Sequence, residues 1–167
     1  MKNLQIIDGN IMNLLKGKDA IVNPQNQYMK KGSGINKSIY EAAGERLLEN
    51  FCQEYYQKDM VANEIRITPG FDLKMDIIHF YPPKFHFSED PIEELRQGYL
   101  KLFAEIERNQ YKNVIMPSLG VGIHGYMHQD VAEIIITEMK KFLENQNITI
   151  TFVVSNKDIK KLYSKYL

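Results

Sequence analysis

Two glycine-rich stretches hold the residues best suited to chemistry in this sequence. Gly32-Ser33-Gly34 follows a lysine pair, and Gly120, Gly122 and Gly125 lie close together later in the chain. Glycine has no Cβ atom, so it adopts positive φ and lets another molecule approach the backbone. A loop of this kind that leads into a helix presents free N–H groups and the positive end of the helix dipole. Each stretch therefore predicts an anion site, most often for phosphate; the alternative is an ordinary strand-to-helix turn with glycines for packing.

Each glycine stretch follows an apolar run that is typical of a buried strand. Ala20-Ile21-Val22 precedes the first stretch, and Asn113-Val114-Ile115-Met116-Pro117 precedes the second. We expect the first strand to stop before Pro24, because proline has no N–H to donate to a sheet. A helix is then expected from about Asn36 to Gln57. Its apolar residues recur at i+4 steps, at Ile39, Ala43, Leu47, Phe51 and Tyr55.

The remaining patterns predict further strands and helices that alternate along the chain. The strands are Leu4–Ile7, Glu64–Thr68, Asp76–Tyr81 and Ile148–Val154, and the helices are Ile92–Ile106, Val131–Phe142 and a short one from Lys157. This alternation predicts an α/β fold, a three-layer α/β/α sandwich with a mixed sheet of about six strands. Ligands lie beyond the carboxyl ends of the strands in such sheets. We therefore expect both glycine stretches at one edge of the sheet.

The loop from Lys84 to Pro91 combines aromatic, histidine and acidic residues. It either covers a pocket or is a surface loop pinned by Phe85 and Phe87, and the second interpretation is favoured. Ser88 or Asp90 is expected to cap the helix that follows.

Length and composition fit one domain over residues 1–167. The chain has 44% hydrophobic residues, and its 21 basic residues balance 21 acidic ones, so no net field attracts nucleic acid or an acidic membrane. Cys52 is the only cysteine, which excludes a disulfide framework and a thiol cluster for zinc. No signal peptide is visible, and no apolar run approaches the ~18 residues of a membrane span. We expect a cytoplasmic protein without a cofactor.

Five motifs in a fixed order give the chain a specific resemblance. They are Gly9-Asn10-Ile11, Val22-Asn23-Pro24-Gln25-Asn26, Gly32-Ser33-Gly34-Ile35 with the later Ala42-Ala43-Gly44, Ile77-Ile78-His79, and Pro117 through Gly122-Ile123-His124-Gly125. In this pattern the chain resembles the macrodomains, which are ADP-ribose-binding modules, essentially from end to end.

The resemblance implies a role for each motif. Asn10 would accept a hydrogen bond from the adenine amine, and Asn26 would hold hydroxyls of the distal ribose. The first loop would wrap that ribose and one side of the diphosphate, and the second would offer backbone N–H groups from the other side. The implied ligand-binding residues are Asn10, Ile11, Asn26, Gly32, Ser33, Gly34, Ile35, Ser118, Leu119, Gly120, Val121, Gly122, Ile123, His124, Ser155 and Asn156. An asparagine after a strand is also a common turn former, which is the alternative for Asn26.

Departures from the macrodomain pattern concern chemistry more than binding. Asn36 stands where many members have an aspartate, which in the MacroD-like hydrolase branch assists attack of water on the ribose, and an amide cannot take that proton. Asn10 replaces a second carboxylate. His124 and Ser155 stand where many members have aromatic rings on the distal ribose and on adenine. Asn26 and Asn36 are thus the candidate catalytic residues, with the ligand's own phosphate helping Asn26 to position a water. His124 is a less favoured base.

The sequence leaves the activity open. It predicts a protein that binds ADP-ribose, or an ADP-ribosylated protein or metabolite, and it leaves hydrolysis of mono-ADP-ribosyl or O-acetyl-ADP-ribose esters undecided. The alternative is a non-catalytic reader of ADP-ribosylation, or of another nucleotide or an RNA end, although composition argues against nucleic acid. The His124 and His128 pair straddles a loop and a helix start, so no metal site is expected.

Overall fold

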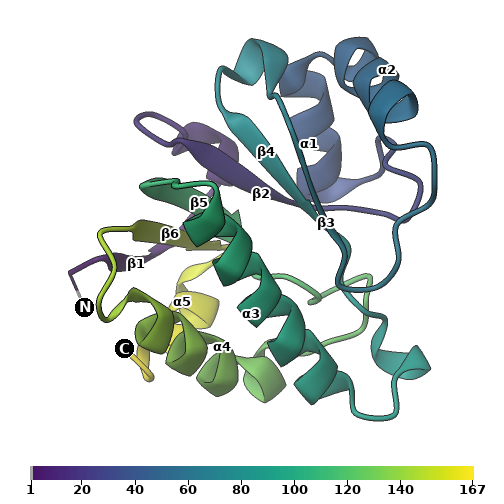
Figure 1. Cartoon of the computed structure of the whole chain (residues 1–167). Coiled ribbons are helices and arrows are strands. Elements are labelled where there is room, and N and C mark those ends of the chain that lie inside the picture. The colour runs from purple at the N-terminus through teal and green to yellow at the C-terminus, as the bar shows by residue number, and fades with distance from the viewer. Residues whose placement is uncertain (1) are drawn as a thin grey trace.

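A single six-stranded sheet forms the centre of the molecule in a computed structural model, which describes residues 2–167 (Figure 1). The strand order is β1-β6-β5-β2-β4-β3. All pairs are parallel except β3 with β4, which is antiparallel and lies at one edge. The strands are β1 (Leu4–Asp8), β2 (Ala20–Pro24), β3 (Ile65–Thr68), β4 (Asp76–Phe80), β5 (Asn113–Pro117) and β6 (Thr149–Val154).

Helices cover both faces of this sheet, and each face has its own apolar core. On one face lie α1 (Gly34–Ala43) and α2 (Glu45–Tyr55); on the other lie α3 (Pro91–Arg108), α4 (His128–Leu143) and α5 (Lys157–Ser164). Central strands contribute alternately: Ala20 and Val22 face α3 and α4, whereas Ile21 faces α1. This arrangement confirms the predicted α/β/α sandwich with a mixed sheet. None of the helices within residues 2–167 is both long and apolar enough to cross a membrane.

Strand β2 is longer than predicted, because it continues through Pro24. Its register with β4 runs to Pro24 opposite Phe80, whereas its register with β5 ends at Ile21 opposite Ile115. A proline is excluded only where its missing N–H would face a paired strand; the Gln25 N–H bonds to Phe80 of β4, so the Pro24 nitrogen faces the other side, where the pairing with β5 has ended. The expectation that the strand stops before Pro24 was therefore wrong.

The predicted long helix is two helices, divided at Gly44. Gly44 has φ of +100°, in the region that favours glycine, and its conformation turns the chain between α1 and α2. The helical phase changes at this point, so Leu48 and Cys52 are buried, whereas Leu47 and Tyr55 are exposed. The i+4 pattern that runs on through Leu47 and Tyr55 gave the wrong face, because such a count assumes one unbroken helix.

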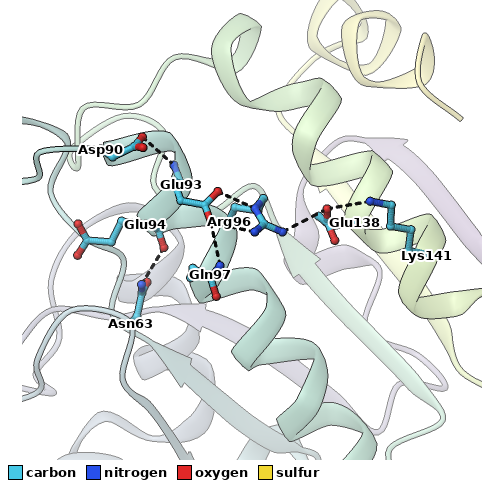
Figure 2. Close-up of polar contacts among 8 residues, drawn as sticks. All are labelled: Asn63, Asp90, Glu93, Glu94, Arg96, Gln97, Glu138 and Lys141. Carbon is cyan, nitrogen blue, oxygen red and sulfur yellow. Dashed lines mark hydrogen bonds and ion pairs between the residues drawn. The ribbon is translucent and has the colours of Figure 1, made fainter.

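The loop before α3 differs from its prediction in one residue. Phe85 packs edge-on against Tyr126, but Phe87 is 85% exposed and pins nothing. Asp90 is the cap, since its side chain accepts a hydrogen bond from the Glu93 N–H, which Figure 2 shows.

A polar network joins α3 to α4 (Figure 2). The Arg96 guanidinium binds both carboxylate oxygens of Glu93, at 2.7 and 2.8 Å, and reaches Glu138 on α4 at 3.5 Å. Lys141 binds the same Glu138 carboxylate at 3.3 Å. Asn63 ties the preceding loop to the start of α3 by donating to the Glu94 carbonyl.

Candidate functional site

The carboxyl ends of β2 and β5 form the centre of the candidate site. Both strands are parallel to β1, β6 and β4, so the loops that follow all five leave the same edge of the sheet. The register between β2 and β5 ends at Ile21 and Ile115, although β2 continues to Pro24 and β5 to Pro117. The two strands therefore separate toward this edge. Each glycine loop follows one of them, which is where open α/β sheets bind ligands.

The first glycine loop ends at an uncapped helix. Ser33 precedes α1 in an extended conformation and makes no capping hydrogen bond, and the first turn of α1 has no acidic residue. The N–H groups of Gly34 and Ile35 have no hydrogen-bond partner among residues 2–167. Gly34 has φ of +59°, and a Cβ there would meet no atom within 4 Å. Free amides and an uncompensated dipole make this helix start suitable for an anion.

The second glycine loop, from Ser118 to Gly125, is open at its tip. Gly120 and Gly122 have φ of +87° and +86°, and Ile123 is 86% exposed. An isolated bridge joins Val121 to Tyr126, next to Gly122. The backbone N–H groups at the tip have no hydrogen-bond partner within the described chain at Gly120, Val121, Ile123 and His124. These amides can donate to a bound anion.

The base of the second loop is already engaged. The Leu119 N–H donates to the Tyr99 hydroxyl at 2.9 Å, so it is already engaged in this structure, and the expectation that Leu119 offers this N–H to a phosphate stays a prediction. The Ser118 hydroxyl lies 2.7 Å from that of Tyr163, which also contacts His128 Nδ1 at 2.9 Å. Two tyrosines from the helical layer thus hold the base of the loop.

A pocket of about 180 Å³ opens beside the start of α1. It brings together four residues that the sequence analysis placed at the ligand, Asn10, Ile11, Ile35 and Ser155, with Gly9, Val153 and Val154. Asn10 Oδ1 accepts a hydrogen bond from the Met12 N–H, so one acceptor of this amide already serves the short 3-10 helix η1 (Ile11–Asn13). Asn156 does not line the pocket, because its side chain caps α5 by accepting from the Ile159 N–H. Larger cavities of about 250 to 430 Å³ lie elsewhere and are lined by none of the predicted residues.

The Asn26 side chain closes its own loop. Its Nδ2 donates to the Lys30 carbonyl at 2.6 Å, and its Oδ1 accepts from the N–H groups of Tyr28 and Lys30. The structure therefore shows the turn-forming role that the sequence left open. A second Nδ2 hydrogen remains for a ligand hydroxyl, so the ribose contact stays a prediction.

Asn36 is buried and belongs to a polar network that sequence reasoning missed. Its Oδ1 accepts from the Gly32 N–H at 2.6 Å, and its Nδ2 donates to Gln25 Oε1 at 2.9 Å. Gln25 and Asn23 both reach His79 Nδ1 at 3.1 Å. The sequence signal for this network was a polar residue inside each of two apolar strands, Asn23 in β2 and His79 in β4. Only the strand register shows that these two residues lie opposite each other.

His79 is neutral in this environment. Complete burial, with a smaller contribution from the Arg66 charge, lowers the pKa of His79 to about 3. His124 is half-buried, and its ring meets that of Tyr81 edge-on, with centroids 5.9 Å apart. Burial, aided by the charge of Lys84, lowers the pKa of His124 as well. Residues 2–167 contain no group of three or more His, Cys, Asp or Glu arranged to hold a metal ion.

Comparisons with known proteins show the family to which the chain is similar. The family model described as Macro domain matches residues 22–135. A macro domain-containing protein of Methanosarcina mazei is 31% identical over 98% of this chain and 89% of its own length. An O-acetyl-ADP-ribose deacetylase of Salmonella newport is 28% identical over 98% of this chain and 93% of its own.

A solved structure shows the same fold. The Oceanobacillus iheyensis macrodomain with ADP superposes with a TM-score of 0.84 at 27% identity, covering 98% of this chain and 88% of that one. The family model, the Methanosarcina relative and the shared fold together show that this chain belongs to the macro domain family.

Proposed function

We propose that this macro domain binds ADP-ribose, free or attached to a protein or metabolite, across the carboxyl edge of its sheet. The observation that carries the proposal is the pair of donor-rich loops on either side of the separation between β2 and β5. One ends in the free amides of Gly34 and Ile35, and the other presents those of Gly120, Val121 and Ile123. A diphosphate needs several convergent donors, and these need not be charged.

The neighbouring features fit the remaining parts of the ligand. The pocket at Asn10, Ile35 and Ser155 is lined mainly by apolar residues and lies at the start of α1, where it receives the adenine. The distal ribose then lies toward Asn26 and His124. Relatives support this proposal, since a macrodomain of 27% identity was solved with ADP.

A second candidate function is hydrolysis of O-acetyl-ADP-ribose, because relatives of 27–28% identity carry the name of that deacetylase. Asn36 does not supply a base in this reaction, since both ends of its amide are used by the buried network. The remaining route is a water positioned by Asn26 and by the ligand's own phosphate. His124 is the one titratable side chain among the predicted ligand-binding residues.

Calorimetry and a product assay separate these functions. We expect the protein to release or absorb heat saturably when titrated with ADP-ribose, and AMP to bind more weakly because it lacks the second phosphate and the distal ribose. A flat ADP-ribose titration would contradict the proposed function. Incubation with O-acetyl-ADP-ribose and with a mono-ADP-ribosylated protein, followed by chromatography, distinguishes an enzyme from a reader by the release of ADP-ribose.

A further inference from the structure

Six uncharged polar side chains form one buried cluster below the first glycine loop. They come from β2, β3, β4, α1 and the residue that follows β2, and none is more than 5% exposed: Asn23, Gln25, Asn36, Tyr40, Thr68 and His79. Buried polar groups are retained where each has a partner, and their geometry then becomes specific. The cluster binds the connection from β2 to α1 at Asn26, Met29 and Gly32, and its contact with the glycine residues themselves is the hydrogen bond from the Gly32 N–H to Asn36.

Two backbone amides fix which way the hydrogen bonds of the cluster run. The Gly32 N–H faces one end of the Asn36 amide, and the Asn26 N–H lies 2.9 Å from one end of the Gln25 amide. A backbone N–H can only donate, so both facing atoms must be oxygens. This settles the orientation of two side-chain amides whose O and N atoms are otherwise interchangeable.

The orientation propagates to His79. The Asn36 nitrogen must face the oxygens of Gln25 and Asn23, at 2.9 and 3.4 Å. The nitrogens of those two amides then point at His79 Nδ1, both at 3.1 Å, so Nδ1 accepts and the ring proton lies on Nε2.

Two hydroxyl groups complete the cluster in the same sense. The His79 Nε2–H donates to Thr68 Oγ1 at 2.9 Å. The Tyr40 hydroxyl accepts from Gln25 and donates to the Met29 carbonyl at 2.6 Å. The chain of hydrogen bonds thus has one direction from Gly32 to Thr68.

We propose that His79 and Thr68 are positioning residues for ligand binding, acting through Asn23, Gln25 and Asn36 on the Gly32 N–H. By holding this amide they keep the glycine loop, and with it the free N–H groups at the start of α1, in the geometry that receives the diphosphate. The same role accounts for the amide at position 36, since only a side chain that both accepts and donates can link the Gly32 N–H to Gln25 in this series of hydrogen bonds. This inference rests on the proposed function.

Two buried threonines provide a matched test. Thr68 and Thr151 are each 1% exposed on strands, but Thr68 Oγ1 contacts His79, whereas Thr151 Oγ1 has no partner within the described residues. Valine has nearly the same shape as threonine. We expect Thr68→Val to weaken ADP-ribose binding by about five- to tenfold in calorimetry, the effect of one lost buried hydrogen bond. Thr151→Val should leave the affinity within about twofold of the parent.

Ligand-free NMR measures the positioning itself. Long-range proton–nitrogen spectra should show His79 with its proton on Nε2, and a proton on Nδ1 would overturn the proposal. Hydrogen exchange at the Gly32 amide should accelerate in Thr68→Val relative to amides in the interior of α1, and should not do so in Thr151→Val. Equal changes in both variants would mean that Thr68 acts only on overall stability.

The outcomes also separate the two proposals. A parent protein that gives no ADP-ribose heat would refute the proposed function, and the NMR measurements would still decide the direction of the hydrogen bonds. A parent that binds, together with a Thr68→Val variant that binds equally well, would refute the positioning role alone.

Discussion

The two glycine loops of this macro domain are held in place by different means. The first is tied at Gly32 by a buried amide from its own helix, supported by strand side chains below it. The second is tied at Leu119 and Ser118 by the hydroxyls of Tyr99 and Tyr163, from α3 and α5. In both loops one end is fixed by buried side chains and the neighbouring amides stay free, so the fixed base and the open tip of each loop can be tested separately.

The open tip of the second loop gives the largest expected effect. Gly122→Glu places a carboxylate where the diphosphate is expected, and we expect ADP-ribose affinity to fall by roughly 100-fold or more in calorimetry. Gly17→Glu is the control, since Gly17 also has positive φ and open space at its Cβ position but precedes β2 at the amino edge. Both variants share the same backbone strain, so equal losses would place the effect in stability and not in the site.

The base of the first loop should tolerate no charge. In Asn36→Asp a carboxylate replaces the donor that faces the Gln25 and Asn23 oxygens, and we expect the free energy of unfolding at pH 7 to fall by about 2–4 kcal/mol. Urea unfolding measures this loss. Asn50→Asp, on the exposed side of α2, makes the same chemical change and should have little effect.

The loss in Asn36→Asp should depend on pH with a defined sign. A protonated carboxyl can still donate, so folding raises the pKa of the introduced aspartate above its unfolded value of about 3.9. The free energy of unfolding of the variant is then closest to that of the parent at pH values below the unfolded pKa. It falls as pH rises through the folded pKa, by about 1.4 kcal/mol for each unit by which folding raises the pKa. A deficit that shrinks with rising pH would contradict the direction assigned to the network.

The base of the second loop should give the smallest effect. Tyr99→Phe removes the acceptor of the Leu119 N–H, and we expect a loss of about 1–2 kcal/mol in unfolding free energy with a two- to fivefold weaker ADP-ribose affinity. Tyr111→Phe removes a hydrogen bond to Asp76 at the amino end of β4, so it should lower stability without changing affinity. If Tyr99→Phe binds ADP-ribose as tightly as Tyr111→Phe and the parent do, then Tyr99 stabilises the fold and does not shape the loop.

Local patterns were sufficient for most of the fold. Strands other than β2 agree with their predicted limits to within one residue, because buried parallel strands give short apolar runs bounded by turn residues. The failures at Pro24 and Gly44 share a cause. Both depend on neighbours distant in the sequence. A strand tolerates a proline where no partner strand pairs with it, and a helix ends at a glycine where the packing of the following segment requires a turn.

By itself the sequence determined the order of strands, helices and glycine loops, and the motifs that indicate a macrodomain, since these depend on residues close together in the chain. Only the tertiary structure decided which groups in the site are free. Leu119 N–H is used because Tyr99 lies beside it, and Asn36 is a bidirectional link because Gly32, Gln25 and Asn23 surround it. The partners of a buried polar group are set by packing between distant segments, which no local pattern records.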